Sequence, residues 1–351
     1  MCVLSHLKIF PTMKNLIKIA LPLLAAVVLT ACGNGGVTKV SSHGSPYELI
    51  IVSSHDNWQG ELGDTLRSVM SQPIPYLMGQ EPMFNVLRIQ PSAFKDFITK
   101  HRNVMIVNVD SKYENPSMTA AYDMYSAPQI IVSVTGPTVE SLTDYVSQYR
   151  EELQANFNIA ERDRYVARVS PYSDKQLDQK VKDKFGFDIK LVKGFKLRNE
   201  ADNFMWISFE YPQSSQGLVI YSYPYSDRSD FSEEALLARR EEFVSKIPGQ
   251  NEGSHMITVT EYPPYVTHMR IHGRYWAEMR GFWDVKNDFM GGPFVSYSTL
   301  DTQNNRVVTL DFYVYSPAPS NPKRNYIRDL ESLMFTVSFP GDKEITEGQA
   351  E

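Results

Sequence analysis

Two hydrophobic patterns alternate between residues 47 and 170. Continuous apolar runs as long as a buried strand predict strands over 49–52, 84–89, 104–109 and 129–135. Apolar residues spaced three or four positions apart predict helices over 60–70, from Ser92 onward, and over 138–157. Alternation of strands and helices favours an α/β layer domain, which we expect over residues 47–170.

Residues 110–128 follow neither pattern and are rich in Tyr, Met and Ser. Connections of this length are often functional or mobile, so we expect a long loop here. Tyr113, Tyr122 and Tyr125 could then present a surface to a ligand or partner. The alternative is a loop that packs over its own domain.

Strand patterns dominate the second half of the chain. A helix capped by Ser173 is expected to end at Gly186, and helices are also expected over 232–247 and after Pro322. The predicted strands cover 189–196, 204–211, 218–225, 266–271, 275–285, 293–300 and 306–315. We expect an α+β sandwich domain with a mostly antiparallel sheet over residues 171–340, and a disordered tail over 341–351. Its order of elements is similar to that of the PsbP/Mog1-like sandwiches.

The N-terminus has the three parts of an export signal. Lys14 and Lys18 precede an apolar run of about eleven residues, too short to cross a bilayer, and small residues follow it. The junction Leu29-Thr30-Ala31-Cys32 matches a lipobox and resembles the processing site of bacterial lipoproteins. The resemblance implies removal of signal peptide 1–31 and attachment of lipid to Cys32, whereas an ordinary secretory signal is the alternative.

A Gly- and Ser-rich segment, residues 32–46, follows the junction and is expected to be a flexible tether. No run of Asp or Glu follows Cys32, which favours an outer-membrane lipoprotein facing the periplasm and leaves surface exposure open. The N-terminal lipid would therefore be the contact with the membrane.

Charge and cysteine content narrow the expected partners. The chain has a formal net charge of −6, and loss of the basic signal peptide would make it more negative. Nucleic acid is therefore not an expected partner, because binding phosphates requires a basic patch. Cys2 and Cys32 are the two cysteines, so removal of residues 1–31 would leave one, and no disulfide is expected.

No sequence signature of catalysis or of a cofactor appears. His268 and His272 are four residues apart, but the flanking pattern is that of a strand, in which they would lie about 13 Å apart. We therefore name no catalytic residue, metal ligand or cofactor, and do not expect an enzyme. An active site assembled from scattered residues stays open.

The densest run of aromatic and charged residues is 274–284. In a strand, the side chains of Trp276, Glu278 and Arg280 share one face, and Trp283 belongs to the other. Arg beside Trp can bind a flat or anionic group. The candidate binding residues are accordingly Arg274, Trp276, Glu278, Arg280 and Trp283, while mere decoration of an exposed sheet is the alternative.

Several short motifs in this half resemble one uncharacterised family. They are Arg274-Tyr275-Trp276, Gly281 with Trp283, the run 291–295, and the basic helix 323–333, and they resemble the Bacteroidetes lipoproteins called domain of unknown function 4837. The resemblance is expected to cover nearly all of the chain after Cys32, and it implies no catalytic residues. Together these observations predict an anchored envelope lipoprotein that binds a ligand or an envelope protein. An envelope hydrolase and a purely structural protein are the alternatives.

Overall fold

The computed structural model describes residues 39–77, 79, 81–212, 214–318 and 322–342. The predicted signal peptide, Cys32 and the first part of the predicted tether lie outside the described residues. Contacts between residues group the described residues from Val40 onward into one compact unit. Within the described residues, no helix combines the length and apolar character needed to span a membrane.

The N-terminal region is built on a mixed sheet with strand order β2-β1-β3-β5-β4. The strands are β1 (Glu48–Val52), β2 (Asn85–Ile89), β3 (Asn103–Val109), β4 (Ser117–Tyr122) and β5 (Ile130–Gly136). The pairs of β1 with β2, β1 with β3 and β3 with β5 are parallel, and β4 joins antiparallel at the edge. Strands β1, β3 and β5 bury residues on both faces, as the continuous apolar runs predict.

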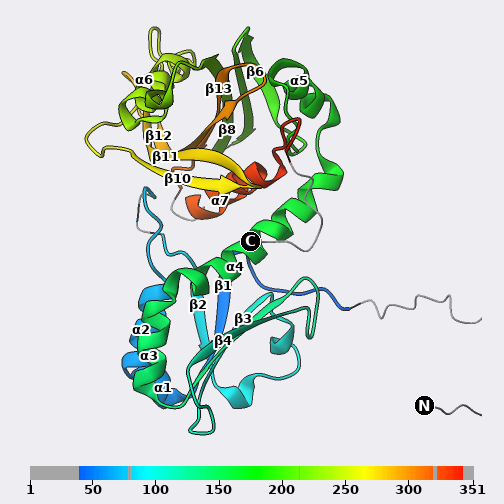
Figure 1. The fold of residues 1–351 in the computed structure, drawn as a ribbon, viewed down its shortest axis with the longest axis vertical. Coiled ribbons are helices and arrows are strands. Elements are labelled where there is room, and N and C mark those ends of the chain that lie inside the picture. The colour runs from blue at the N-terminus through cyan, green and yellow to red at the C-terminus, as the bar shows by residue number, and fades with distance from the viewer. Residues whose placement is uncertain (1–38, 78, 80, 213, 319–321, 343–351) are drawn as a thin grey trace, which may run out of the picture. The chain divides into compact units, whose positions relative to one another are not determined.

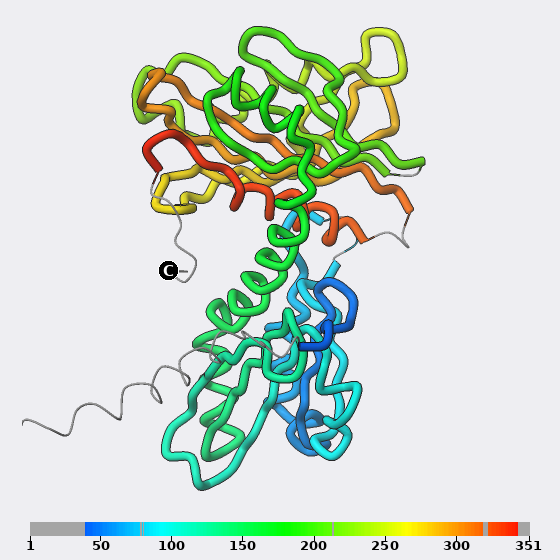
Figure 2. Tube along the Cα trace, turned by 90° about the vertical axis from the view of Figure 1, so that its right-hand side faces the viewer, coloured from blue at the N-terminus to red at the C-terminus, as the bar shows by residue number. Residues whose placement is uncertain are grey.

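Helices cover one face of this sheet (Figure 1). They are α1 (His55–Gln59), α2 (Glu61–Met70), α3 (Val139–Gln148) and α4 (Arg150–Val169). The side chain of Thr138 caps α3 by accepting a hydrogen bond from the backbone N–H of Ser141. The single helix expected over 138–157 is interrupted at Tyr149, and α4 then continues for 20 residues (Figure 2).

Two predictions for this region are wrong. The helix expected from Ser92 is replaced by short 3-10 turns, Pro91–Ala93 and Ile98–Lys100, because Asp96 has a left-handed backbone (φ 53°) that ends any helical run. The expected loop 110–128 contains strand β4, whose exposed, weakly alternating residues gave no strand signal. It pairs antiparallel with the next strand, β5, and these backbone hydrogen bonds make it a strand without requiring an apolar pattern in its own side chains.

Residues 40–43, expected in the flexible tether, contact the N-terminal region. The N–H of Ser42 donates to the carbonyl of Ala127 at 3.1 Å, and the N–H of His43 donates to the carbonyl of Lys100 at 3.2 Å. The ring of His43 stacks on that of Phe97 with centroids 3.7 Å apart. This part of the segment is therefore fixed by backbone bonds and ring stacking, which its Gly and Ser content does not predict.

The C-terminal region has an antiparallel sheet with strand order β10-β11-β12-β13-β8-β7-β6, and β9 pairs with β11. Within the described residues the strands are β6 (Lys196–Ala201), β7 (Phe204–Tyr211), β8 (Ser214–Pro224), β9 (Met256–Thr258), β10 (Tyr265–Ile271), β11 (Arg274–Val285), β12 (Gly291–Asp301) and β13 (Arg306–Tyr315). The strands β8, β12 and β13 are buried along nearly their whole length because helices cover both faces.

The helices of this region are α5 (Lys175–Phe185), α6 (Glu233–Val244) and α7 (Lys323–Leu333). Apolar residues of α5 and α7 pack with Trp276 on one face of the sheet, and those of α6 pack with Trp283 on the other. The predicted fold class, an α/β region followed by an α+β region with a mostly antiparallel sheet, is confirmed.

Local details of the C-terminal region differ from the prediction. The cap of α5 is Asp174, whose carboxylate accepts from the backbone of Gln176 and Leu177, and not Ser173. The strand expected over 189–196 does not form, although all these residues are described. In this segment the N–H of Leu191 donates to the carboxylate of Asp178. Because a side chain takes this donor, the backbone forms only isolated bridges, such as the one between Val192 and Ser173, and no continuous strand.

Candidate functional site

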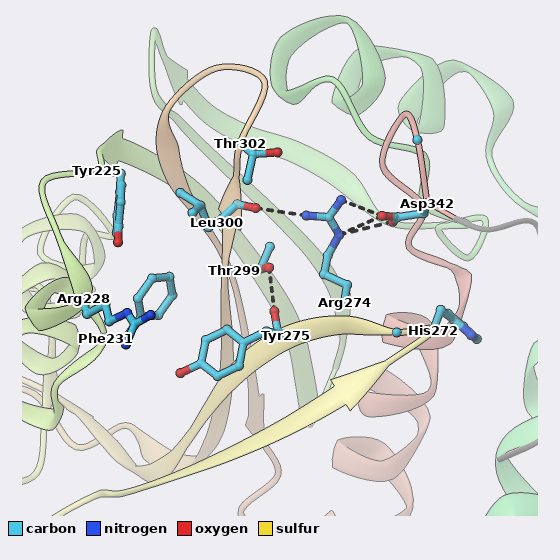
Figure 3. Close-up of a pocket in the computed structure, with 12 residues that line it drawn as sticks. Tyr225, Arg228, Phe231, His272, Arg274, Tyr275, Thr299, Leu300, Thr302 and Asp342 are labelled. Atoms are coloured by element: carbon cyan, nitrogen blue, oxygen red, sulfur yellow. Dashed lines mark hydrogen bonds and ion pairs between the residues drawn. The ribbon is translucent and has the colours of Figure 1, made fainter.

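A pocket of about 730 Å³ opens at the end of the C-terminal sheet where β8 and β12 end and β11 begins (Figure 3). We call it the sheet-end pocket. Its lining residues come from four separate segments: Tyr225, Arg228 and Phe231; His272, Gly273, Arg274 and Tyr275; Thr299, Leu300 and Thr302; and Gly341 with Asp342. The site is therefore assembled by the closing of the sheet and not by a local motif.

The turn between β10 and β11 forms one wall. His272 and Gly273 both have positive φ, 53° and 77°, which is the backbone of the tight two-residue turns that join antiparallel strands. The Nε2 atom of His272 lies 3.2 Å from the carbonyl of Phe335. This geometry places Arg274 and Tyr275, the first residues of β11, at the mouth of the pocket.

Arg274 is the candidate binding residue that lines the pocket, and its guanidinium is already engaged. It forms an ion pair with Asp342 at 2.6 Å, donates to the carbonyl of Leu300 at 2.9 Å, and lies 4.2 Å from the ring centre of Phe339 (Figure 3). Its side chain is 17 % exposed. Arg274 therefore holds the pocket wall together, and Asp342, expected in the disordered tail, is part of that wall.

Aromatic rings form the opposite side of the pocket. Phe231 lies between Tyr225 and Tyr275, with ring centres 6.3 Å and 5.4 Å away. The hydroxyl of Tyr275 is 2.8 Å from Nδ1 of His268 on the neighbouring strand, and burial raises the pKa of the Tyr275 phenol. The phenol therefore stays neutral and can both donate and accept hydrogen bonds at neutral pH.

Arg228 supplies a charge at the aromatic side. Its side chain is exposed, and within the described part of the chain it makes no hydrogen bond or ion pair. A guanidinium presents several N–H donors in a planar fork, which matches carboxylate, sulfonate and phosphate groups. The pocket thus combines ring surfaces with a positive charge that has no described partner.

The other candidate binding residues lie elsewhere. Trp276 and Trp283 are each 2 % exposed and belong to the cores on opposite faces of the sheet. The indole N–H of Trp283 donates to the carbonyl of Val314 at 3.2 Å. Neither ring offers a surface to a ligand, because helices and loops cover both.

Glu278 and Arg280 belong to a buried charge cluster beneath α7. Arg280 pairs with Glu278 at 2.6 Å and also with Glu331 of α7. Burial opposes the charge on Arg280, but attraction to Glu331 and Glu278 outweighs it and holds the pKa of the guanidinium above its usual value. These groups neutralise one another and attach α7 to β11, so they act in the fold and not in the sheet-end pocket.

Sequence reasoning missed Tyr225, Arg228, Phe231 and Asp342. No local signal could have found them, since Tyr225 and Asp342 are more than one hundred residues apart in the chain. Among the described residues, no group of three or more His, Cys, Asp or Glu side chains is placed to hold a metal ion. The rings that line the pocket can contact a flat group, and Arg228 can pair with an anion.

Similar solved structures match less than half of this chain, at low identity. The Ran-binding protein Mog1p of Saccharomyces cerevisiae is 11 % identical with a TM-score of 0.29, and the match covers 43 % of this chain and 89 % of Mog1p. LpqN of Mycobacterium tuberculosis, described as involved in cell envelope biogenesis, is 9 % identical with a TM-score of 0.27, covering 43 % and 82 %. At TM-scores this low, the likeness supports no conclusion about the fold or function of this chain. No curated protein matches the chain.

Family comparisons divide the chain in two. Residues 42–170 match a domain of unknown function, DUF8532. The resemblance to domain of unknown function 4837 was expected over nearly all of the chain after Cys32, but the matched residues cover only the C-terminal half. Residues 174–336, which include the aromatic strand β11 and helix α7, match the family described as domain of unknown function DUF4837, as the motifs in this half predict.

Proposed function

We propose that the protein is a bacterial envelope lipoprotein, held in the outer membrane by lipid on Cys32, that binds a small ligand in the sheet-end pocket on the periplasmic side. The observation that carries the binding role is the pocket itself, where the rings of Tyr225, Phe231 and Tyr275 adjoin the exposed Arg228. The lipobox Leu29-Thr30-Ala31-Cys32 supports the attachment of lipid to Cys32.

The lining chemistry favours a flat, anionic ligand. Rings whose centres lie about 5 to 6 Å apart offer faces and edges for an aromatic or unsaturated group. Arg228 can then pair with the negative group of the ligand, because the other guanidinium of the pocket, that of Arg274, is neutralised by Asp342. A neutral aliphatic ligand would leave Arg228 unused.

Binding is better supported than hydrolysis. A hydrolase needs a nucleophile and a base within hydrogen-bond reach of each other. In the described pocket, the hydroxyl of Thr299 instead donates to the carbonyl of Tyr275, and His272 bonds the carbonyl of Phe335. Neither group activates the other. The hydroxyl of Tyr275 does meet an imidazole, Nδ1 of His268 at 2.8 Å, but burial raises the pKa of this phenol, which disfavours the phenolate that a nucleophile would require.

The binding proposal is tested with 1-anilinonaphthalene-8-sulfonate, a fluorescent flat anion. The wild-type protein is expected to bind the probe saturably, and Arg228→Ala to weaken binding about tenfold, because a hydrogen bond to a charged group contributes roughly 1.5 kcal/mol or more. Phe231→Ala should also weaken it. Lys286→Ala, which removes an exposed cation remote from the lining residues, is the matched control.

Equal affinity in all four proteins would contradict the pocket as the binding site. The anchor is tested separately by fractionating cells that produce the wild type or Cys32→Ala. The wild type should sediment with the outer membrane and the variant should be found in the soluble periplasmic fraction. Retention of Cys32→Ala in the membrane would contradict lipid attachment at this residue.

A further inference from the structure

A group of exposed apolar side chains lies where the described chain begins. Val40, Phe97, Met124 and Tyr125 are between 45 % and 67 % exposed, and we call them the Phe97 patch. Large apolar side chains exposed together mark a surface that another apolar phase or molecule covers. None of these residues lines the sheet-end pocket.

Hydrogen bonds hold the three segments of the patch together. The N–H of Ala127 donates to the carbonyl of Val40 at 2.9 Å, which ties the first described residues to the segment that carries Met124 and Tyr125. The side-chain amide of Gln129 donates to the carbonyl of Thr99 at 2.6 Å, which ties the same segment to the one that carries Phe97. The segments that carry the exposed side chains are thus held to one another.

Ring contacts fix the patch further. Phe97 stacks on His43, whose Nε2 atom lies 2.7 Å from the carbonyl of Phe97. Tyr125 meets Phe94 edge to face, with ring centres 6.0 Å apart. Phe97 is nevertheless 67 % exposed, because His43 covers one face of its ring and leaves the rest to solvent.

The charges around the patch nearly cancel. Lys39 adjoins Val40, Lys95 and Lys100 lie in the same segment as Phe97, and Asp96 and Asp123 adjoin the apolar residues in sequence. The surroundings are therefore close to neutral in a chain whose formal net charge is −6. A phospholipid surface would not repel this part of the protein as it would the acidic remainder.

The position of the patch relative to the proposed anchor selects the partner. Val40 is eight residues after Cys32, and a chain of that length reaches at most about 29 Å even when fully extended. We propose that the Phe97 patch contacts the lipid head groups of the leaflet that holds the Cys32 lipid, and so orients the protein on the membrane. This inference rests on the proposed lipid attachment.

The physical basis is the preference of aromatic rings for the interface between lipid and water. Tyr125 has an apolar ring and a polar hydroxyl, and Phe97 and Met124 are apolar throughout, so the interface can accept all of them. Eight residues of chain restrain the patch near the bilayer, which raises its effective concentration there and makes a weak contact sufficient.

The test uses the absence of free thiols after processing. Cys2 and Cys32 are the two cysteines of the chain, the first in the predicted signal peptide and the second carrying the lipid, so an introduced cysteine can be labelled alone. Nitroxide labels are placed at Phe97→Cys and Met124→Cys. The control sites are Phe289→Cys and Tyr172→Cys, which are at least as exposed and lie outside the patch.

The lipidated full chain is placed in vesicles of phosphatidylethanolamine and phosphatidylglycerol. Collision of each label with oxygen, which concentrates in lipid, is compared with collision with a water-soluble nickel chelate. Labels at 97 and 124 should collide more with oxygen and less with nickel than labels at 289 and 172. Each labelled protein must first show the thermal unfolding midpoint of the wild type. Met124 is not part of the stacked pair of Phe97 and His43, so its label reports even if Phe97→Cys disturbs the surroundings of that pair.

Failure of the patch and failure of the anchor give different results. If the protein does not stay on the vesicles, the lipid anchor is refuted and this inference with it. If the protein stays bound but both patch labels collide with nickel as often as the control labels, the anchor stands and the membrane contact is refuted. Shielding from nickel without a gain in oxygen collisions would mean that a protein or a second copy covers the patch, which also overturns the inference.

Discussion

The ion pair between Arg240 and Asp311 joins α6 to β13 in the core of the C-terminal region. Both side chains are fully buried, their closest atoms are 2.7 Å apart, and Arg240 also donates to the hydroxyl of Thr258 at 2.6 Å. The guanidinium lies 3.5 Å from the ring centre of Phe294. Burial raises the pKa of Asp311 and Arg240 opposes that rise, so the carboxylate depends on this partner for its charge.

Replacing Arg240 by Met keeps an apolar side chain over Phe294 and removes the charge. Breaking a buried ion pair on one side costs about 3 to 5 kcal/mol, because the remaining charge has no compensation. We expect a loss of that size in the free energy of unfolding at pH 7, measured by urea titration with tryptophan fluorescence. The double variant Arg240→Met, Asp311→Leu should recover most of the loss, since a buried pair and its apolar replacement are often similar in stability.

The loss should also depend on pH in a definite direction. Without Arg240 the folded-state pKa of Asp311 rises further above the unfolded value, so the carboxyl binds its proton more tightly in the folded protein. The variant should therefore be less destabilised relative to the wild type at pH 4.5 than at pH 7. The proton on Asp311 stabilises the folded variant at low pH, and this stabilisation is lost as the pH rises through the pKa of Asp311 in the folded state. Arg239→Met, which breaks a surface pair with Glu242, is the neighbouring control and should cost less than about 0.5 kcal/mol.

A loss below about 1 kcal/mol at pH 7 would refute this reasoning, since it would mean that water or another group compensates Asp311. A double variant as unstable as the single one would refute it as well, because the loss would then come from packing and not from the unpaired charge.

Three further predictions concern single positions. Burial raises the pKa of Asp329 to about 7, so the thermal unfolding midpoint of the wild type is expected to fall as the pH rises from about 4 to about 7; Asp329→Asn should flatten this fall, and an unchanged slope would contradict the shift. Asp174→Ala should lower the free energy of unfolding by about 1 kcal/mol through loss of the helix cap and Ser173→Ala by less, whereas the reverse order in urea titrations would favour the cap predicted from sequence. Gly217→Ala should prevent or severely weaken folding, because a Cβ there would lie 2.0 Å from the ring of Tyr313; a circular dichroism melt like that of the wild type would contradict this.

The hydrophobic pattern predicted the elements that bury a regular face. Strands β1, β3, β5, β7, β11 and β13 and helices α2 and α6 form close to their expected positions, because their pattern records which side chains leave water. The hydrophobic pattern gave wrong predictions where backbone conformation or backbone hydrogen bonds, and not side-chain burial, determine the secondary structure. Strand β4 exists through hydrogen bonds to β5, and Asp96 interrupts a helix through a single left-handed backbone angle.

The candidate binding residues were also predicted only in part from the sequence. The sequence drew attention to the residues from 274 to 284, and the structure divides them among different environments. Arg274 lines the sheet-end pocket, Trp276 and Trp283 enter opposite cores, and Glu278 and Arg280 form a buried charge cluster. Strand alternation predicts which side chains share a face, but which face a ligand can reach depends on the helices that cover it.

By itself, the sequence determined the elements with a regular apolar face, the fold class, and the family motifs of the C-terminal half, because each of these is recorded in neighbouring residues. Only the tertiary structure decided that Tyr225, Arg228, Phe231 and Asp342 meet around one pocket, and that the segments carrying Val40, Phe97 and Tyr125 are hydrogen-bonded together. These groupings depend on contacts between segments far apart in the chain, which leave no local pattern in the order of residues.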